Sequence, residues 1–163
     1  PAYNVDEPRK PLEMSKERNL FKLFYSDVGL LTGAYLNSTA LDILAGDDEV
    51  NYGAIYENVV AQELTAHGFS QLYYYNSKRL GELDFLVQDR NDNIIPIEVK
   101  SGKDYTVHSA LNTFVSNKDY HIKKAFVLSN ERTVTSDGKI NYIPIYYIMF
   151  FKNDVGKTGS FTF

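Results

Sequence analysis

The chain has 163 residues, enough for one domain with a proper core, and its 44% hydrophobic content with 13 Tyr and 10 Phe excludes disorder for most of its length. Its net charge of −4 counts against a protein that coats nucleic acid, because such proteins need clustered Lys and Arg to release counterions. The sequence has no apolar run as long as a membrane span, no signal segment and no cysteine, so we expect a cytoplasmic protein without membrane contact, disulfides or thiolate metal sites.

Residues 1–18 are rich in proline and charge, which predicts a linker or an extended arm. The chain begins with Pro1 rather than Met, so we expect it to be a piece of a longer protein with a preceding domain. The aromatic run Leu20–Tyr25 predicts a short strand. Asp27 is expected to cap a short apolar helix, and Ser38-Thr39 to cap a second one.

Residues 52–67 carry the clearest helical periodicity of the chain. Most of their apolar side chains fall on one arc of a helix, Asn58 falls opposite that arc, and Gly68 is a stop signal. Glu57 lies at the edge of the apolar arc, from where it can reach along a neighbouring sheet. Taken alone, Glu57 is better interpreted as an exposed helix charge.

A strand is expected at Phe69–Tyr75, followed by a polar turn that contains Lys78 and Arg79. These two cations are candidates for contacts with nucleic-acid phosphates. The alternative is that both are simply solvated loop charges.

Residues 81–102 predict a β-hairpin with a polar loop at 89–93. Because side chains alternate along a strand, Asp84 is expected to face away from its apolar neighbours, and Glu98 and Lys100 to share one face. Two neighbouring carboxylates repel each other unless a cation lies between them, and Mg²⁺ or Mn²⁺ prefers such oxygen ligands. We therefore interpret Asp84 and Glu98 as metal ligands and Lys100 as the group that positions water or steadies developing charge. The alternative is an ordinary hairpin with solvent-facing charges.

The remaining elements are a helix near 107–117, a strand at 124–129, a turn at 134–139 and a hydrophobic strand at 140–151. Pro144 inside the last strand indicates an edge position or a break. His67, His108 and His121 do not fall at metal-ligand spacings. The order of helix, three strands, helix and two strands predicts an α/β sandwich with a central mixed sheet flanked by helices.

Glu57 on the first helix, Asp84 on one strand and Glu98-Val99-Lys100 on the next resemble the pattern of the PD-(D/E)xK restriction-endonuclease-like superfamily. That resemblance implies a restriction-endonuclease-like sandwich in which Asp84 and Glu98 hold Mg²⁺ or Mn²⁺. It also implies that Lys100 assists the attacking water and that Glu57 contacts metal or water. Leu83 replaces the proline that precedes the first acid in the pattern.

Four blocks in order resemble a narrower family, the C-terminal domain of unknown function of bacterial and archaeal AAA-type ATPases: FKLFYSDVGLL, YGAIYENVVAQEL, GELDFLV and IPIEVKSG. The resemblance covers about residues 19–150. It implies a nuclease-like domain over residues 19–151, a tail over 152–163, and an ATPase portion before Pro1 in the parent chain.

Two functions remain open from the sequence. One is a metal-dependent phosphodiester hydrolase that acts on nucleic acid, with DNA expected rather than RNA. The other is a catalytically inactive nuclease-like scaffold that binds a protein partner or regulates the linked ATPase, which the aromatic content and the acidic net charge favour.

Overall fold

The computed structural model describes residues 1–35, 41–43, 45, 52–89, 91–102 and 104–153. The expected cap at Ser38-Thr39 lies outside the described residues. In chain order the elements are β1 (Ala2–Asn4), the 3-10 helix η1 (Leu12–Ser15), β2 (Glu17–Lys22), α1 (Val28–Gly33), α3 (Gly53–Ala66), β3 (Leu72–Ser77), β4 (Gly81–Gln88), β5 (Ile94–Lys100), α4 (Ser109–Ser116), η2 (Lys118–Tyr120), β6 (Ala125–Ser129), β7 (Thr135–Asp137), β8 (Ile140–Pro144) and η3 (Ile145–Phe150).

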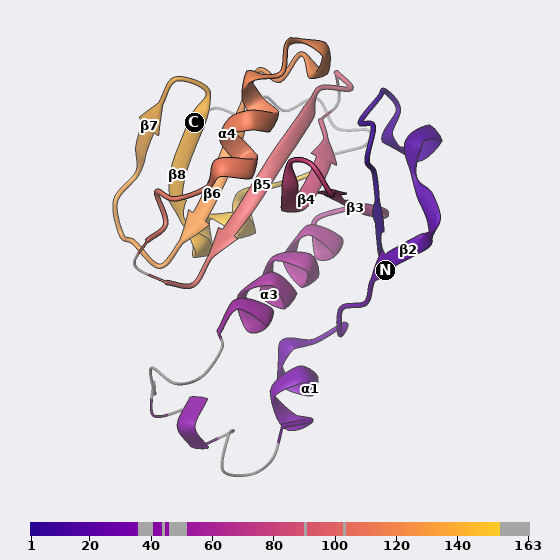
Figure 1. Cartoon of the computed structure of the whole chain (residues 1–163). Coiled ribbons are helices and arrows are strands. Elements are labelled where there is room, and N and C mark those ends of the chain that lie inside the picture. The colour runs from indigo at the N-terminus through magenta and orange to yellow at the C-terminus, as the bar shows by residue number, and fades with distance from the viewer. Residues whose placement is uncertain (36–40, 44, 46–51, 90, 103, 154–163) are drawn as a thin grey trace.

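The described strands form one mixed eight-stranded sheet in the order β2-β1-β3-β4-β5-β6-β8-β7. The hairpin strands β4 and β5 are antiparallel and central, whereas β5, β6 and β8 run parallel to one another. Helices α3 and α4 lie on opposite sides of this sheet (Figure 1). The predicted α/β sandwich with a mixed sheet flanked by helices is therefore confirmed.

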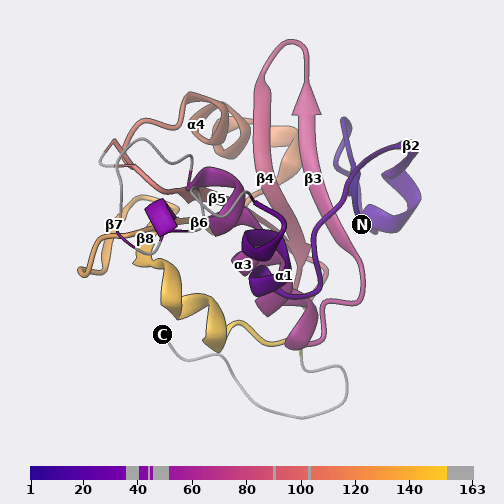
Figure 2. The same ribbon diagram turned by 90° about the horizontal axis from the view of Figure 1, so that it is seen from below.

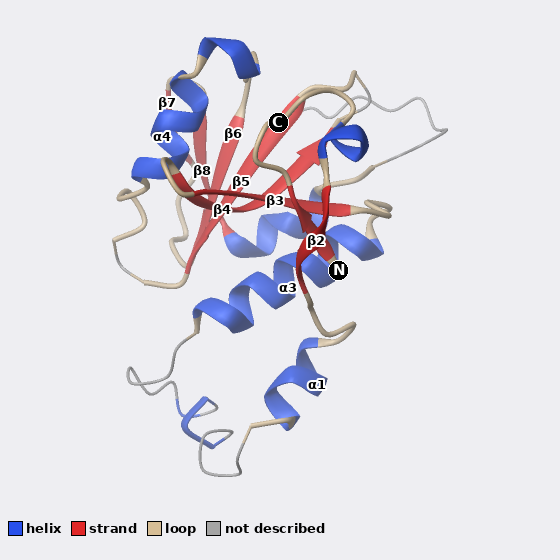
Figure 3. Cartoon of the chain, turned by 45° about the vertical axis from the view of Figure 1, so that its right-hand side comes forward, coloured by secondary structure: helices blue, strands red, loops and turns tan. Residues whose placement is uncertain are grey.

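Two hydrophobic clusters fill the space between the sheet and its helices. One lies on the α3 side and includes Val60 and Leu64 of that helix with Phe85 and Ile97 of the sheet. The other lies on the α4 side and includes Phe114 with residues from the same strands. Strands buried on both faces read as continuous apolar runs, which explains the pattern of β6. Figure 3 shows the two helical layers around the strands.

The N-terminal residues differ from the expected arm, because β1 and β2 are strands of the same sheet. β1 runs parallel to β3 and antiparallel to β2. Ala2 and Val5 are fully buried, so this segment belongs to the core although its prolines and charges indicate a linker. The apolar residues that bury this segment in the core are too few and too scattered to show the alternation of a strand.

Helix α3 is covered on two sides, by the sheet and by the segment that leads from β2 into α1, which Figure 2 shows beside it. Asn58, expected on the outer face, is 2% exposed. Its side chain accepts the backbone N–H of Tyr25 at 2.8 Å and donates to the Tyr25 carbonyl at 3.2 Å. Asp27 caps α1 as predicted, by accepting the N–H of Gly29 at 2.7 Å.

The last predicted strand is too long. β8 ends at Pro144 and the chain continues as the 3-10 helix η3, because proline has no N–H to continue a ladder. The segment expected as a turn before it contains the short strand β7, which pairs with β8 and occupies the edge. Gly138, at φ 57°, lies in the turn between them.

Candidate acidic site

The acidic site is built around a β-bulge in β4. Tyr73 pairs with Leu86 and Tyr75 with Leu83, so two residues of β4 stand opposite the single residue Tyr74. These two residues are Asp84 and Phe85. Leu83 belongs to the cluster on the α4 side and Phe85 to the cluster on the α3 side, so the simple alternation expected for this strand is wrong here. The bulge turns Asp84 toward the α3 face, and such bulges commonly re-aim a side chain at a functional site.

Asp84 lies where the pairing of the hairpin ends. The last pair of the β4–β5 ladder on this side is Phe85 with Ile97, and just beyond it Asp84 Oδ2 accepts the backbone N–H of Val99 at 2.7 Å. Burial and the charges of Glu98 and Glu57 raise the pKa of Asp84 to about 8, against the opposing effects of the Val99 hydrogen bond and Lys22. A carboxylic acid with such a pKa retains a proton at neutral pH unless a cation replaces it.

Glu98 is the most buried acid of the site, at 7% exposure. Its Oε1 lies 2.8 Å from the Lys100 ammonium, and among the described residues no donor reaches its buried Oε2. Burial raises the pKa of Glu98, and the Lys100 ammonium opposes that rise. Because Ile97 and Val99 pack on the α3 side, strand alternation directs Glu98 and Lys100 toward the α4 side, so Asp84 and Glu98 approach the strand gap from different faces.

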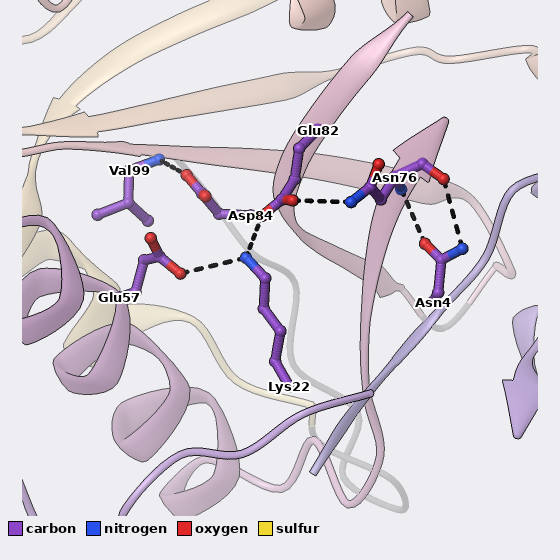
Figure 4. Close-up of polar contacts among 7 residues, drawn as sticks. All are labelled: Asn4, Lys22, Glu57, Asn76, Glu82, Asp84 and Val99. Carbon is purple, nitrogen blue, oxygen red and sulfur yellow. Dashed lines mark hydrogen bonds and ion pairs between the residues drawn. The ribbon is translucent and has the colours of Figure 1, made fainter. Parts of the chain in front are cut away.

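A lysine from the N-terminal strand pair completes the site. The Lys22 ammonium lies 3.3 Å from Glu57 Oε2 and forms a second ion pair with Glu82 (Figure 4). Glu57 projects from α3 toward Val99 and Asp84 in the same view. Glu57 is thus directed to the acids rather than to solvent, and its charge is already paired.

Asn4 and Asn76 fix the strand that carries Lys22. The Asn4 side chain accepts the backbone N–H of Asn76 at 2.8 Å (Figure 4). It also donates to the Glu17 carboxylate on β2. Asn76 in turn donates to Glu82 at 3.0 Å. These bonds tie β1, β2 and β3 together beside the acids.

The structure therefore brings Glu57, Asp84, Glu98 and Lys100 to the end of one hairpin, with Glu98 and Lys100 on the face of the sheet opposite Asp84 and Glu57. Lys78 and Arg79 are exposed in the turn that leads into β4. Within the described ranges, no three His, Asp or Glu side chains are close enough to one another to form a group that could hold a metal ion.

Sequence reasoning missed two groups of this site. Lys22 sits in a segment whose pairing with β1 carries no local signal. His108, at 5% exposure, precedes α4, attracts the Glu98 carboxylate and contacts the Tyr142 hydroxyl through Nε2 at 2.8 Å. No spacing rule links His108 to Glu98, since β5, which carries Glu98, and β8, which carries Tyr142, come together only through their parallel pairing with β6.

An apolar cavity of about 140 Å³ lies elsewhere in the described part of the chain. Phe69, Phe126 and Phe151 line it, and none of the predicted site residues does. None of the described helices is long and apolar enough to cross a bilayer.

An α/β sandwich with a buried acidic pair at the end of a central hairpin is the class of domain that the fold and the site define. The sequence profile of a domain of unknown function (DUF4143) matches residues 52–148, well over half of the chain. The chain belongs to this family. The match starts just before α3 and ends in η3, so β1 and β2 lie outside it. No curated protein and no solved structure matches the chain.

Proposed function

We propose that this domain is a Mg²⁺- or Mn²⁺-dependent phosphodiester hydrolase of the PD-(D/E)xK type that acts on nucleic acid, with DNA preferred over RNA. In the parent protein it would follow an AAA-type ATPase portion. The observation that carries the proposal is the acidic pair Asp84 and Glu98.

The acidic pair is chemically incomplete as it stands. Asp84 and Glu98 repel each other, burial raises the pKa of each, and Glu98 Oε2 is buried without a hydrogen-bond donor. Leaving a buried acceptor unsatisfied costs about 1–3 kcal/mol. A hard divalent cation would offset the repulsion between the two carboxylates and would give the buried Glu98 oxygen a partner, because such ions prefer carboxylate oxygens. Because Mg²⁺ is commonly held by one or two carboxylates with waters in its other positions, these two acids alone would have to hold it, without a third acid from the described residues.

The order of elements also supports the proposal. Helix α3, the strands β3 to β5, helix α4 and strand β6 follow one another in the order expected from the sequence, with Glu57, Asp84 and Glu98 on α3, β4 and β5. A fold alone does not define an activity, so the proposed hydrolysis depends on Asp84 and Glu98.

Each residue then has a defined role. Asp84 and Glu98 would hold the cation, and Glu57 would contact a water or a second ion. A bound divalent cation supplies a lowered water pKa and screens the phosphate charge. Lys100, whose ammonium is held 2.8 Å from Glu98, would orient the attacking water and steady the developing negative charge. Lys78 and Arg79, exposed beside the same hairpin, would contact backbone phosphates.

Incubation of the purified domain with plasmid, single-stranded and branched DNA, and with RNA, in the presence of Mn²⁺ tests the proposal. Asp84→Ala and Lys100→Met are expected to abolish cleavage. Asp137→Asn and Lys123→Met, which change exposed residues away from the acids, should retain it. Cleavage that persists in Asp84→Ala and Lys100→Met would reveal a contaminant and end the proposal.

A second candidate function is a nuclease-like scaffold without catalysis that contacts a protein or regulates the linked ATPase. Lys22 already neutralises part of the acidic site. Large apolar side chains are also exposed on and after β2, where Leu20 and Phe21 are each 51% exposed and Leu23 is 75% exposed. Exposed apolar groups of this kind are typical of protein interfaces.

Calorimetric titration with Mg²⁺ and Mn²⁺ separates the two functions. A hydrolase of this type requires binding at millimolar concentration or below. A folded domain that binds neither ion at that concentration is the scaffold.

A further inference from the structure

The positive charge of Lys22 lies among the acids Glu57, Glu82 and Asp84. Its ammonium lies 3.3 Å from Glu57, forms an ion pair with Glu82, and attracts the Asp84 carboxylate. Figure 4 shows it reaching into the acids from β2, with Glu57 on one side and Glu82 and Asp84 on the other. One side chain from the sheet edge thus counters three acids from two other elements.

The surroundings of Lys22 hold it in this position. Its side chain is only 26% exposed, and its ammonium lies 5.2 Å from the centre of the Tyr74 ring. Burial by itself lowers the pKa of Lys22, but the Glu82 hydrogen bond and the charges of Glu57, Glu82 and Asp84 outweigh burial and raise it. The ammonium is therefore a permanent charge at physiological pH.

We propose that Lys22 is the built-in counter-ion of the acidic site, and that a divalent cation binds Asp84 and Glu98 only against the repulsion of its ammonium. This inference rests on the proposed function, because it concerns the same acids. It adds a positioning residue that sets the affinity of the site for its ion.

The placement of Lys22 gives this arrangement a physical basis. β2 is one of the two edge strands of the described sheet and pairs only with β1 among the described strands. Both strands lie outside the segment that matches the family profile, whereas the three acids lie inside it. The acids thus belong to the shared part of the domain, and their counter-ion comes from the part that precedes it.

Binding of Mn²⁺ to purified wild-type and variant domains, followed by electron paramagnetic resonance of the free ion and by calorimetry, tests the inference without any activity assay. Lys22→Met removes the charge and keeps the stem over Tyr74. An opposite charge within 4–6 Å commonly shifts a carboxyl pKa by about 1–3 units, so its removal should tighten Mn²⁺ binding by about tenfold or more. Lys22→Arg, which retains the charge, should bind as the wild type does.

Lys16→Met is the matched control. Lys16 also comes from the N-terminal segment, forms an ion pair with Glu13 and lies 4.9 Å from the centre of the Tyr3 ring, and neither of these residues belongs to the acidic site. Its replacement should leave the Mn²⁺ affinity unchanged. Thermal unfolding of each variant verifies the fold, and Lys22→Gln replaces Lys22→Met if the latter does not fold.

The outcomes separate the inference from the proposed function. Tighter binding confined to Lys22→Met supports the inference. If only this variant binds, the inference stands and the wild-type domain is the scaffold rather than the hydrolase. Equal or weaker binding in Lys22→Met than in the wild type overturns the inference and leaves the hydrolase proposal standing. Absence of binding in every folded variant at millimolar Mn²⁺ overturns both.

Discussion

Neutralising Asp84 should stabilise the domain at alkaline pH. Asp84→Asn keeps an oxygen that accepts the Val99 N–H and removes a charge that burial, Glu98 and Glu57 all disfavour. The same substitution at an ordinary hydrogen-bonded acid is neutral or destabilising. A gain in stability is therefore a specific consequence of this site.

The sign and size follow from the pKa of Asp84. Its folded-state value of about 8 lies above the ordinary 3.8, so the folded state binds more protons than the unfolded state between these values. The contribution of Asp84 to the unfolding free energy of the wild type therefore falls as pH rises from about 4 to about 8 and stays constant above pH 8. The difference between these two pKa values corresponds to at most about 6 kcal/mol of unfolding free energy. Because Asp84 is partly exposed, we expect Asp84→Asn to gain only about 2–3 kcal/mol at pH 8.

Urea unfolding of the wild type and of Asp84→Asn at pH 5 and pH 8, without divalent cations, measures this gain. The difference in unfolding free energy between the two proteins should widen by about 2 kcal/mol or more from pH 5 to pH 8. Asp137→Asn, at the exposed edge strand β7, should show no such widening. An Asp84→Asn variant that is no more stable than wild type at pH 8 would refute the picture of a repelling, buried acid pair.

Two further predictions concern the packing that positions the site. Asn58→Ala leaves the backbone N–H and carbonyl of Tyr25 without their side-chain partner. Urea unfolding should show a loss of about 1–3 kcal/mol in unfolding free energy. A loss below about 0.5 kcal/mol would show that the β2–α1 segment does not depend on α3. Gly68→Ala should lower stability by about 1–2 kcal/mol, because Gly68 has a φ of 94° and a new Cβ would lie 2.9 Å from the Asn153 carbonyl oxygen. Gly102→Ala should leave thermal unfolding nearly unchanged, because no atom lies within 4 Å of the new Cβ and Gly102 has no positive φ. An equal loss of stability in Gly68→Ala and Gly102→Ala would contradict the steric explanation.

The central hairpin and the helix before it could be predicted because their signals are local. Alternation and turn residues define residues 81–102, and the structure has strands at Gly81–Gln88 and Ile94–Lys100. The period of 3.6 residues likewise predicts a helix at Tyr52–His67, and α3 spans Gly53–Ala66.

Features that depend on how segments pair and pack could not be predicted. The bulge at Asp84 exists because β3 and β4 pair with an offset, and nothing in GELDFLV itself marks the extra residue. Lys22 reaches the acids because β1 joins β2 to β3, although residues 23–71 separate β2 from β3 in the chain. Asn58 is buried because the segment at Tyr25 packs against α3. Such contacts are decided by the tertiary fold rather than by propensity or period.

The central claim is that Asp84 and Glu98 together hold a divalent cation. Crystals of the domain soaked in Mn²⁺, with data collected at the manganese absorption edge, test it most directly. The account predicts an anomalous peak within coordination distance of carboxylate oxygens of both Asp84 and Glu98, and no such peak in Asp84→Asn crystals soaked in the same way. Soaked wild-type crystals with ordered Asp84 and Glu98 side chains and no anomalous peak between them would contradict it.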